Sequence, residues 1–283
     1  MTVLLGAVAY DPKVVTIWFG FRDWLREHGL DFDFVLYSNY ERQAEDLVEG
    51  RIDVAWNSPL AWLRCERLAS SRGRRVTPLL MRDTDQDLTS VFVVRADSPL
   101  RTIADLSGAR LALGAIDSPQ ARLIPLATLA DAGLLAGRDV AIERFDVGVG
   151  LHGDHIGGER DAVRAVFEGR ADAAAIIDSN HLAFGRDGTV PSSSLRIIGQ
   201  TTPFDHCNLT AVDTAPAAEV ERLAELLLSM SYADETVRHL LDLEGLTRWL
   251  PGRASGYGVL NTAVDLLDFY DAAGTVTASD YRP

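Results

Sequence analysis

The 283-residue sequence has little of what marks several protein classes. Its two cysteines, Cys65 and Cys207, are too few for a disulfide framework and allow at most one bridge. No stretch approaches the ~20 consecutive apolar residues of a membrane span. The opening residues, MTVLLGAVAY, hold no basic residue, so they lack the charged start of a signal peptide and predict a core strand instead. We therefore expect either a cytoplasmic protein or a periplasmic protein or extracellular lipoprotein whose leader has been removed.

Positive charge is also scarce. The chain carries 27 Lys and Arg against 41 Asp and Glu, a formal net charge of -14. A surface this acidic repels phosphate backbones and anionic lipid headgroups, so neither nucleic acid nor a membrane surface is an expected partner. Apolar residues make up 47% of the chain, which is enough to build a folded core. The length favours about two domains.

Short apolar runs alternate with helical patterns along the chain. Residues 3–8 read as a buried strand, and apolar side chains at helical spacing from Val14 to Leu25 predict a helix that Gly29 ends. We expect the polar tail after Thr275 to be loosely held. The alternation predicts an α/β fold with a mainly parallel sheet and helices on both faces. Further strands are expected at 33–37, 52–56, 89–94, 111–114, 140–145, 173–177 and 195–200, and further helices at 41–49, 59–70, 123–132, 161–168, 219–230, 235–243 and 260–269.

Three segments and a C-terminal pattern carry a family resemblance. Residues 49–62 read E-G-R-I-D-V-A-W-N-S-P-L-A-W, residues 92–108 include V-R-A-D-S-P and I-A-D-L-S-G, and residues 161–175 place D-A-V-R-A-V before G and D-A-A-A. Glu244-Gly245-Leu246 and Gly256-Tyr257 follow near the end. In this order, over nearly the whole chain, they resemble the type-2 periplasmic binding proteins, in particular the phosphate/phosphite/phosphonate branch of ABC-transporter receptors.

The resemblance implies an α/β fold of two lobes joined by two hinge crossovers, near residues 89–92 and 201–206. Residues 1–90 and 205–283 would form the first lobe, and residues 91–204 the second. It also implies a solute-binding protein that captures a small polar or anionic ligand in the inter-lobe cleft, with an ABC-transporter permease as partner.

The alternative is a cytoplasmic enzyme on the same fold, a lyase or similar biosynthetic enzyme, metal-assisted through His and Cys side chains in the cleft. No G-x-S-x-G, H-E-x-x-H or phosphate-loop motif is present. In an enzyme, Asp117 and His155 would be the acid/base pair. Whether the chain is an enzyme stays open at this point.

Departures from the family pattern bear on the ligand. The loop that should meet a phosphonate with hydroxyl and N–H groups reads Ile116-Asp117-Ser118-Pro119-Gln120. Asp117 would repel a phosphonate, and Pro119 lacks an N–H donor. Arg160 stands where the family has a His; it would clamp a carboxylate or form a surface ion pair. A ligand mixing a cationic or polar group with a carboxylate fits at least as well as a phosphonate.

Candidate ligand contacts follow the predicted strands. Ligands of open α/β sheets bind at the carboxyl ends of strands, where Trp56 to Ser58 and Asp117 to Gln120 are expected. The competing interpretation is that Ser58 and Ser118 only cap the next helices. The candidate ligand-binding residues are Tyr10, Trp56, Asn57, Ser58, Ser90, Asp117, Ser118, Gln120, Arg160, Asp178 and His181.

Histidine and cysteine gather between residues 152 and 207. His152, His155, His206 and Cys207 are candidate ligands for a transition metal, since imidazole and thiolate suit zinc and its neighbours. No recognised zinc signature is present, so the alternative is a set of polar cleft residues that bind an organic ligand. The sequence indicates no other cofactor.

Overall fold

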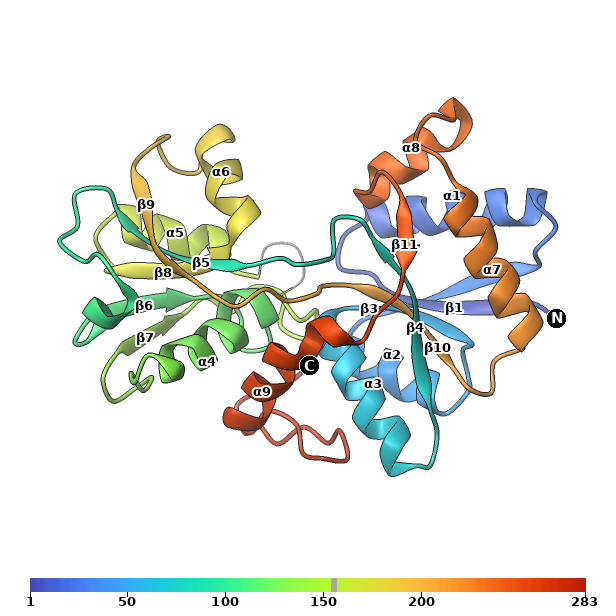
Figure 1. Ribbon diagram of the computed structural model, residues 1–283, viewed down its shortest axis with the longest axis horizontal. Coiled ribbons are helices and arrows are strands. Elements are labelled where there is room, and N and C mark those ends of the chain that lie inside the picture. The colour runs from blue at the N-terminus through green and yellow to red at the C-terminus, as the bar shows by residue number, and fades with distance from the viewer. Residues whose placement is uncertain (154–156) are drawn as a thin grey trace.

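The chain forms two β-sheets that lie side by side, each flanked by helices (Figure 1). The computed structural model describes residues 1–153 and 157–283. Within them the first sheet has six strands, in the order β11-β4-β10-β3-β1-β2, and the second has five, in the order β7-β6-β8-β5-β9. The strands are β1 (Val3–Val8), β2 (Phe32–Tyr37), β3 (Val54–Asn57), β4 (Val76–Arg82), β5 (Ser90–Arg95), β6 (Arg110–Leu113), β7 (Ala141–Arg144), β8 (Ala173–Ile177), β9 (Leu195–Gln200), β10 (Asn208–Val212) and β11 (Trp249–Pro251).

The helices form where apolar side chains recur every three or four residues. In α1 (Lys13–Glu27) the buried residues Val14, Ile17, Phe21 and Leu25 share one face, which packs in the core of the first sheet. The other α-helices are α2 (Tyr40–Val48), α3 (Pro59–Ser71), α4 (Ile124–Asp131), α5 (Glu159–Phe167), α6 (Asp178–Arg186), α7 (Ala217–Ser229), α8 (Glu235–Glu244) and α9 (Gly258–Leu266), and a π-helical turn spans Pro119–Leu123.

Both sheets are mixed, so the expectation of a mainly parallel sheet is wrong. In the first sheet β1 pairs in parallel with β2 and β3, whereas β10 pairs antiparallel with β3 and β4. In the second sheet β5 runs antiparallel to both β8 and β9. The physical reason is the chain path: β4 and β5 lead from the first sheet to the second, and β9 and β10 lead back in the opposite direction.

Two passages connect the sheets. The chain leaves the first sheet after β4 and enters the second at Ser90, and it returns between β9 and β10. The passages pair with each other, since Leu88 and Phe204 exchange backbone hydrogen bonds of 2.8 Å in both directions. The first passage therefore lies slightly earlier than residues 89–92, most of which belong to β5. The lobe boundaries at 90/91 and 204/205 stay a prediction.

An apolar seam also joins the two lobes. One buried cluster combines Trp62 of α3, Ile124 of α4 and Leu260 of α9 with Tyr281 of the C-terminal tail. Tyr281 is 1% exposed. The expectation of a loosely held tail is therefore wrong at this aromatic residue, because its ring fills the seam although the residues around it are polar.

Both cysteines are buried, and neither forms a disulfide bridge within the described part of the chain. Among the described residues, no helix is both long and apolar enough to cross a bilayer.

Candidate functional site

A cavity of about 390 Å³ lies between the two sheets. It sits at the carboxyl ends of β4 and β8, beside the passages that connect the lobes, which is where ligands of two-lobed α/β proteins are enclosed. Its walls come from both lobes, so a ligand bound there would contact both at once. The lining residues are Arg82, Thr84, Asp85, Leu88 and His206 on the side of the first sheet and the passages, and Gln120, Ile177, Ser179 and Asn180 on the side of the second sheet.

A buried carboxylate supports the second-sheet wall. Glu159, at the start of α5, is 0% exposed, and its Oε2 accepts hydrogen bonds of 2.9 Å from the Ile177 N–H and from Asn180 Nδ2. Burial raises the pKa of Glu159 to about 7. The Glu159 side chain is therefore poised between its neutral and ionised forms near neutral pH.

Gln120 brings an acceptor to the same wall. Its Nε2 donates to Gly153 O at 3.0 Å and to Glu159 Oε1 at 3.4 Å. Its Oε1 is buried and, within the described part of the chain, has no hydrogen-bond partner. Such an orphaned oxygen costs free energy unless a ligand or water donates to it.

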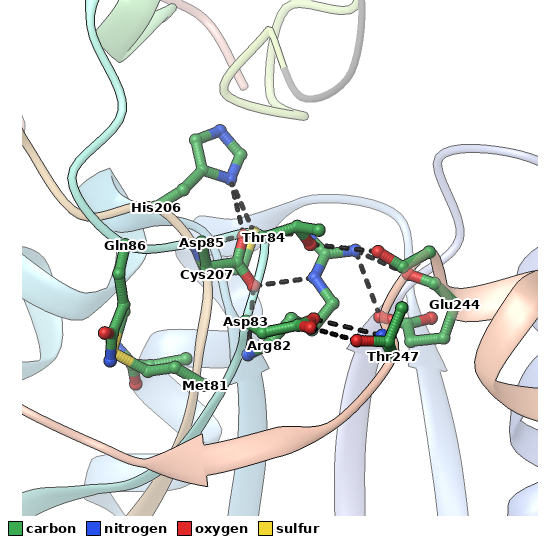
Figure 2. A network of polar contacts seen from close by, with 12 residues as sticks. Met81, Arg82, Asp83, Thr84, Asp85, Gln86, His206, Cys207, Glu244 and Thr247 are labelled. Atoms are coloured by element: carbon green, nitrogen blue, oxygen red, sulfur yellow. Dashed lines mark hydrogen bonds and ion pairs between the residues drawn. The ribbon is translucent and has the colours of Figure 1, made fainter. Parts of the chain in front are cut away.

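A charged network forms the first-sheet wall (Figure 2). Arg82 lies at the end of β4 over the ring of Trp56, 5.3 Å from its centroid. Arg82 Nε donates to Asp85 Oδ2 at 2.6 Å, Nη2 donates to Oδ1 at 2.8 Å, and Nη1 donates to Glu244 O at 2.8 Å. Burial acts to raise the pKa of Asp85, but the guanidinium beside it holds that pKa well below its usual range. Asp85 is thus a fixed negative charge on the cavity wall.

His206 and Cys207 adjoin this carboxylate, as Figure 2 shows. His206 Nδ1 lies 3.5 Å from Asp85 Oδ1 and 3.1 Å from Cys207 Sγ. All three residues are buried, and one ligand atom of each lies within 4.8 Å of the others. An imidazole, a thiol and a carboxylate therefore converge beside the cavity.

A second cluster joins the lobes at the seam. Asp117 Oδ2 accepts hydrogen bonds from the N–H groups of Gly150 at 2.7 Å and His152 at 3.0 Å, which holds this loop of the second lobe. His152 Nδ1 lies 2.6 Å from Ser58 Oγ, and its Nε2 lies 2.9 Å from Glu41 Oε1. Both ring nitrogens of His152 are thus engaged with the first lobe, and in this arrangement neither is open to a metal ion.

Glu41 is the centre of that seam. Besides His152, its Oε1 accepts hydrogen bonds from the hydroxyl groups of Tyr270 at 2.9 Å and Tyr281 at 2.6 Å. Burial acts to raise the pKa of Glu41, but the interactions with His152, Tyr281 and Arg64 lower it to about 2. The carboxylate therefore binds together a first-lobe helix, a second-lobe loop and the C-terminal tail.

The predicted ligand residues divide among different places. Gln120 and His206 line the cavity, and Ser90 lies behind Gln120, donating to its backbone oxygen at 2.6 Å. Ser58 and Asp117 belong to the seam, where Ser58 also caps α3 by accepting a hydrogen bond from the Ala61 N–H. His155 lies outside the described residues.

The other predicted residues lie away from the cavity lining. Ser118 caps the π-helical turn, and Trp56 packs edge-on against Trp249. Asn57 is buried and donates to Thr210. Tyr10 sits at the edge of the first core with Lys13 over its ring.

Three more candidates, Arg160, Asp178 and His181, are on α5 and α6 and do not line the cavity. Arg160 pairs with Asp187 at 2.8 Å, which corresponds to the surface ion pair considered as its alternative role. Asp178 begins α6 and accepts a hydrogen bond from Thr89, and His181 faces an outer hollow near residues 190–196.

Four residues that matter most were not predicted: Arg82, Asp85, Glu159 and Asn180. Asp85 lies in an acidic stretch, D-T-D-Q-D, that reads as an exposed loop. Glu159 stands in E-R-D at a helix start, where acidic residues are common for dipole reasons alone. Nothing in either pattern signals burial.

Comparison with known proteins identifies the family. Residues 7–257 match the family model described as ABC transporter, phosphonate, periplasmic substrate-binding protein. In this family the predicted solute-binding function is confirmed, and the enzyme alternative receives no support.

Solved structures support the fold. PhnD1 of Prochlorococcus marinus, solved in complex with methylphosphonate, is 16% identical with a TM-score of 0.71 over 94% of this chain and 98% of that one. XAC2383 of Xanthomonas citri, solved with ATP, is 20% identical with a TM-score of 0.70 over 96% of each chain. The aliphatic sulphonate-binding protein SsuA of Escherichia coli is 17% identical with a TM-score of 0.54, over 93% of this chain and 82% of that one. The predicted two-lobed α/β fold is confirmed, and the chain belongs to the phosphonate family of periplasmic substrate-binding proteins of ABC transporters.

Proposed function

We propose that this protein is a periplasmic receptor that encloses a small zwitterionic solute, carrying one ammonium group and one oxyanion group, between its lobes and delivers it to an ABC-transporter permease. The observation that carries the proposal is the orphaned Gln120 Oε1 on the second-sheet wall, with the buried Glu159 carboxylate directly behind it. An ammonium group has three donors and no acceptor, so it donates to Gln120 Oε1 while its charge is attracted by Glu159.

The charge of the cavity argues in the same direction. Asp85 is held ionised on one wall and Glu159 lies directly behind the other, whereas the guanidinium of Arg82 is already occupied by Asp85 and Glu244. A phosphonate without an amine, such as the methylphosphonate bound by PhnD1, would meet two carboxylates and no unengaged guanidinium of Arg82. Like charges brought together in a desolvated site cost several kcal/mol.

The oxyanion end of the solute belongs at the opposite side of the cavity from Glu159, on the wall formed by the first sheet and the passages. On that side Thr84 is exposed and His206 carries an imidazole.

The test compares ligands that differ only in the amine. Isothermal titration calorimetry with 2-aminoethylphosphonate and with ethylphosphonate, and with β-alanine and propionate, isolates the contribution of the ammonium group. We expect the amine to tighten binding at least about tenfold, which corresponds to one charge-assisted hydrogen bond.

Glu159→Gln should remove most of that preference while leaving the shape of the wall unchanged. The matched control is Glu168→Gln at the exposed end of the same helix, which should keep the preference. Equal affinity for the amine and non-amine ligands, or tighter binding of ethylphosphonate, would overturn the proposal.

The cellular part of the proposal is tested separately. Cell fractionation should find the native gene product in the periplasm, and transport of the bound solute should require the cognate permease. Retention in the cytoplasm would refute the delivery step but not the ligand chemistry.

A further inference from the structure

We propose that Asp85, His206 and Cys207 form a binding site for a divalent transition metal, with zinc as the best fit, on the first-sheet wall of the cavity. The three side chains come from two distant parts of the chain, the passage after β4 and the passage before β10, and meet in one buried cluster (Figure 2).

The arrangement around the imidazole brings three possible metal ligands together. One atom, His206 Nδ1, faces both Cys207 Sγ and Asp85 Oδ1. Three donor atoms that converge on one point are what a metal ion requires.

Two of the donor distances lie close to those of a tetrahedral zinc site. Bonds of about 2.0–2.1 Å to nitrogen or oxygen and about 2.3 Å to sulfur give a nitrogen–oxygen edge of about 3.4 Å and a nitrogen–sulfur edge of about 3.6 Å. The corresponding distances are 3.5 Å from His206 to Asp85 and 3.1 Å from His206 to Cys207. A small movement of the sulfur would complete the geometry.

The charges of the buried network also favour a divalent cation. Arg82 contributes +1, while Asp85 and Glu244 contribute -1 each; when Cys207 loses its thiol proton to a bound metal, the four side chains carry -2 and a divalent ion makes them neutral. All four are less than 10% exposed. Uncompensated charge in such a place is costly, and a bound metal removes it.

Supporting contacts hold the donors in position. The two hydrogen bonds from Arg82 fix the orientation of the Asp85 carboxylate, and the Cys207 N–H donates to Asp85 Oδ1 at 3.3 Å. The Tyr257 hydroxyl donates to the backbone oxygen of His206 at 2.9 Å. Outer contacts of this kind are a regular part of metal sites. The mixture of sulfur, nitrogen and oxygen suits zinc and excludes magnesium and calcium.

The fourth coordination position of the metal would be available to bind the solute in the cavity. Asp85 and His206 line the cavity, so an open position on the metal faces the ligand. Three protein ligands with one open position is the pattern of sites that bind an exogenous oxygen. On the basis of the proposed function, that oxygen is the oxyanion of the zwitterionic solute, and the metal explains how an acidic cavity holds an anionic group.

The metal site is tested with metal ions alone. The full chain is stripped with chelator and titrated with Zn²⁺ by calorimetry and with Co²⁺ by absorption spectroscopy, in which a thiolate–cobalt charge-transfer band reports a Cys ligand. We expect one ion per chain, a charge-transfer band, and about 100-fold or greater loss of affinity in Cys207→Ser.

The control is Cys65→Ser, which changes the other buried cysteine and should keep both the stoichiometry and the band. His206→Ala, at the cavity wall, serves as a second variant if Cys207→Ser fails to fold; it should weaken Zn²⁺ binding comparably. Absence of stoichiometric Zn²⁺ binding in the native chain, or unchanged binding and an unchanged band in a folded Cys207→Ser or His206→Ala variant, overturns the site.

Ligand titrations separate this inference from the proposed function. Binding of 2-aminoethylphosphonate should be at least about tenfold tighter in the zinc-loaded protein than in the stripped protein. Equal binding in both forms would refute coordination of the solute by the metal. If the solute binds and Zn²⁺ does not, the result supports the proposed function and refutes the metal site.

Discussion

Replacing Glu41 with Gln should lower the free energy of unfolding of the protein, by an amount that depends on pH. The substitution keeps the size of the side chain and leaves an oxygen that accepts from Tyr270 and Tyr281, but it removes the negative charge that faces His152. The loss of stability in this variant therefore measures the contribution of the Glu41 charge at the seam between the lobes more than the contribution of side-chain packing.

The magnitude follows from the pKa of Glu41. A fall from 4.5 to about 2 means that ionisation of this carboxyl stabilises the folded state by about 3 kcal/mol at neutral pH. Because the pKa is lower in the folded than in the unfolded chain, this stabilisation is fully present above about pH 4.5 and is lost as the pH falls toward 2.

The assay is urea unfolding of the wild-type protein and Glu41→Gln between pH 3 and pH 7. We expect the free energies of unfolding to differ by about 3 kcal/mol at pH 7, with a Tm roughly 5–10 °C lower, and the difference to shrink as the solution is acidified. Glu27→Gln, at an exposed position on α1, is the control and should change stability by less than about 0.5 kcal/mol.

A difference between Glu41→Gln and wild type that stays constant from pH 7 to pH 3 would refute the reasoning, since it would mean that the ionised form carries no special stabilisation. Equal free energies of unfolding for the two proteins at pH 7 would also refute the reasoning.

Three further outcomes are expected. Burial raises the pKa of Glu159 to about 7, so the stability of the ligand-free protein should decline as pH rises from about 4.5 to about 7, and Glu159→Gln should abolish this decline in urea titrations. Tyr281→Phe removes the 2.6 Å hydrogen bond to Glu41 and should cost about 1.5–3 kcal/mol, measured by calorimetric melting. Gly153→Ala should lower the Tm measurably, because Gly153 has φ +57° and a Cβ there would lie 2.6 Å from Ser118 Cβ; an unchanged melting curve would contradict the described loop.

Some elements could be predicted from sequence because their burial appears as an apolar run. The runs at β1 and β8 predicted both strands at the observed bounds. Strand β4 was missed because Pro78 lies within it, and proline argues against a strand. Pro78 is tolerated next to a shift in the register between β4 and β10. Strand β10 was missed because Asn208 and Thr210 make it look polar, although both are buried and hydrogen-bonded.

The candidate site could be predicted only in part, for a similar reason. His206 and Cys207 stood out as unusual residue types, and they do meet. Their partner Asp85 is far away in sequence and only the antiparallel passages bring it near. Neighbouring residues on a helix point about 100° apart, so Glu159 turns inward and Arg160 outward; a single sequence gives no information about which of the two faces the core.

The position of the C-terminal residues has a practical consequence for building reporters. Pro283 lies against Gly150, in the loop that contacts the first lobe, whereas the N-terminus lies at the far end of the six-stranded sheet (Figure 1). A fluorophore attached after Pro283 would therefore stand where the two lobes meet, and its emission should change when they separate. The same dye attached before Met1 would move with the first lobe alone and serve as the reference signal.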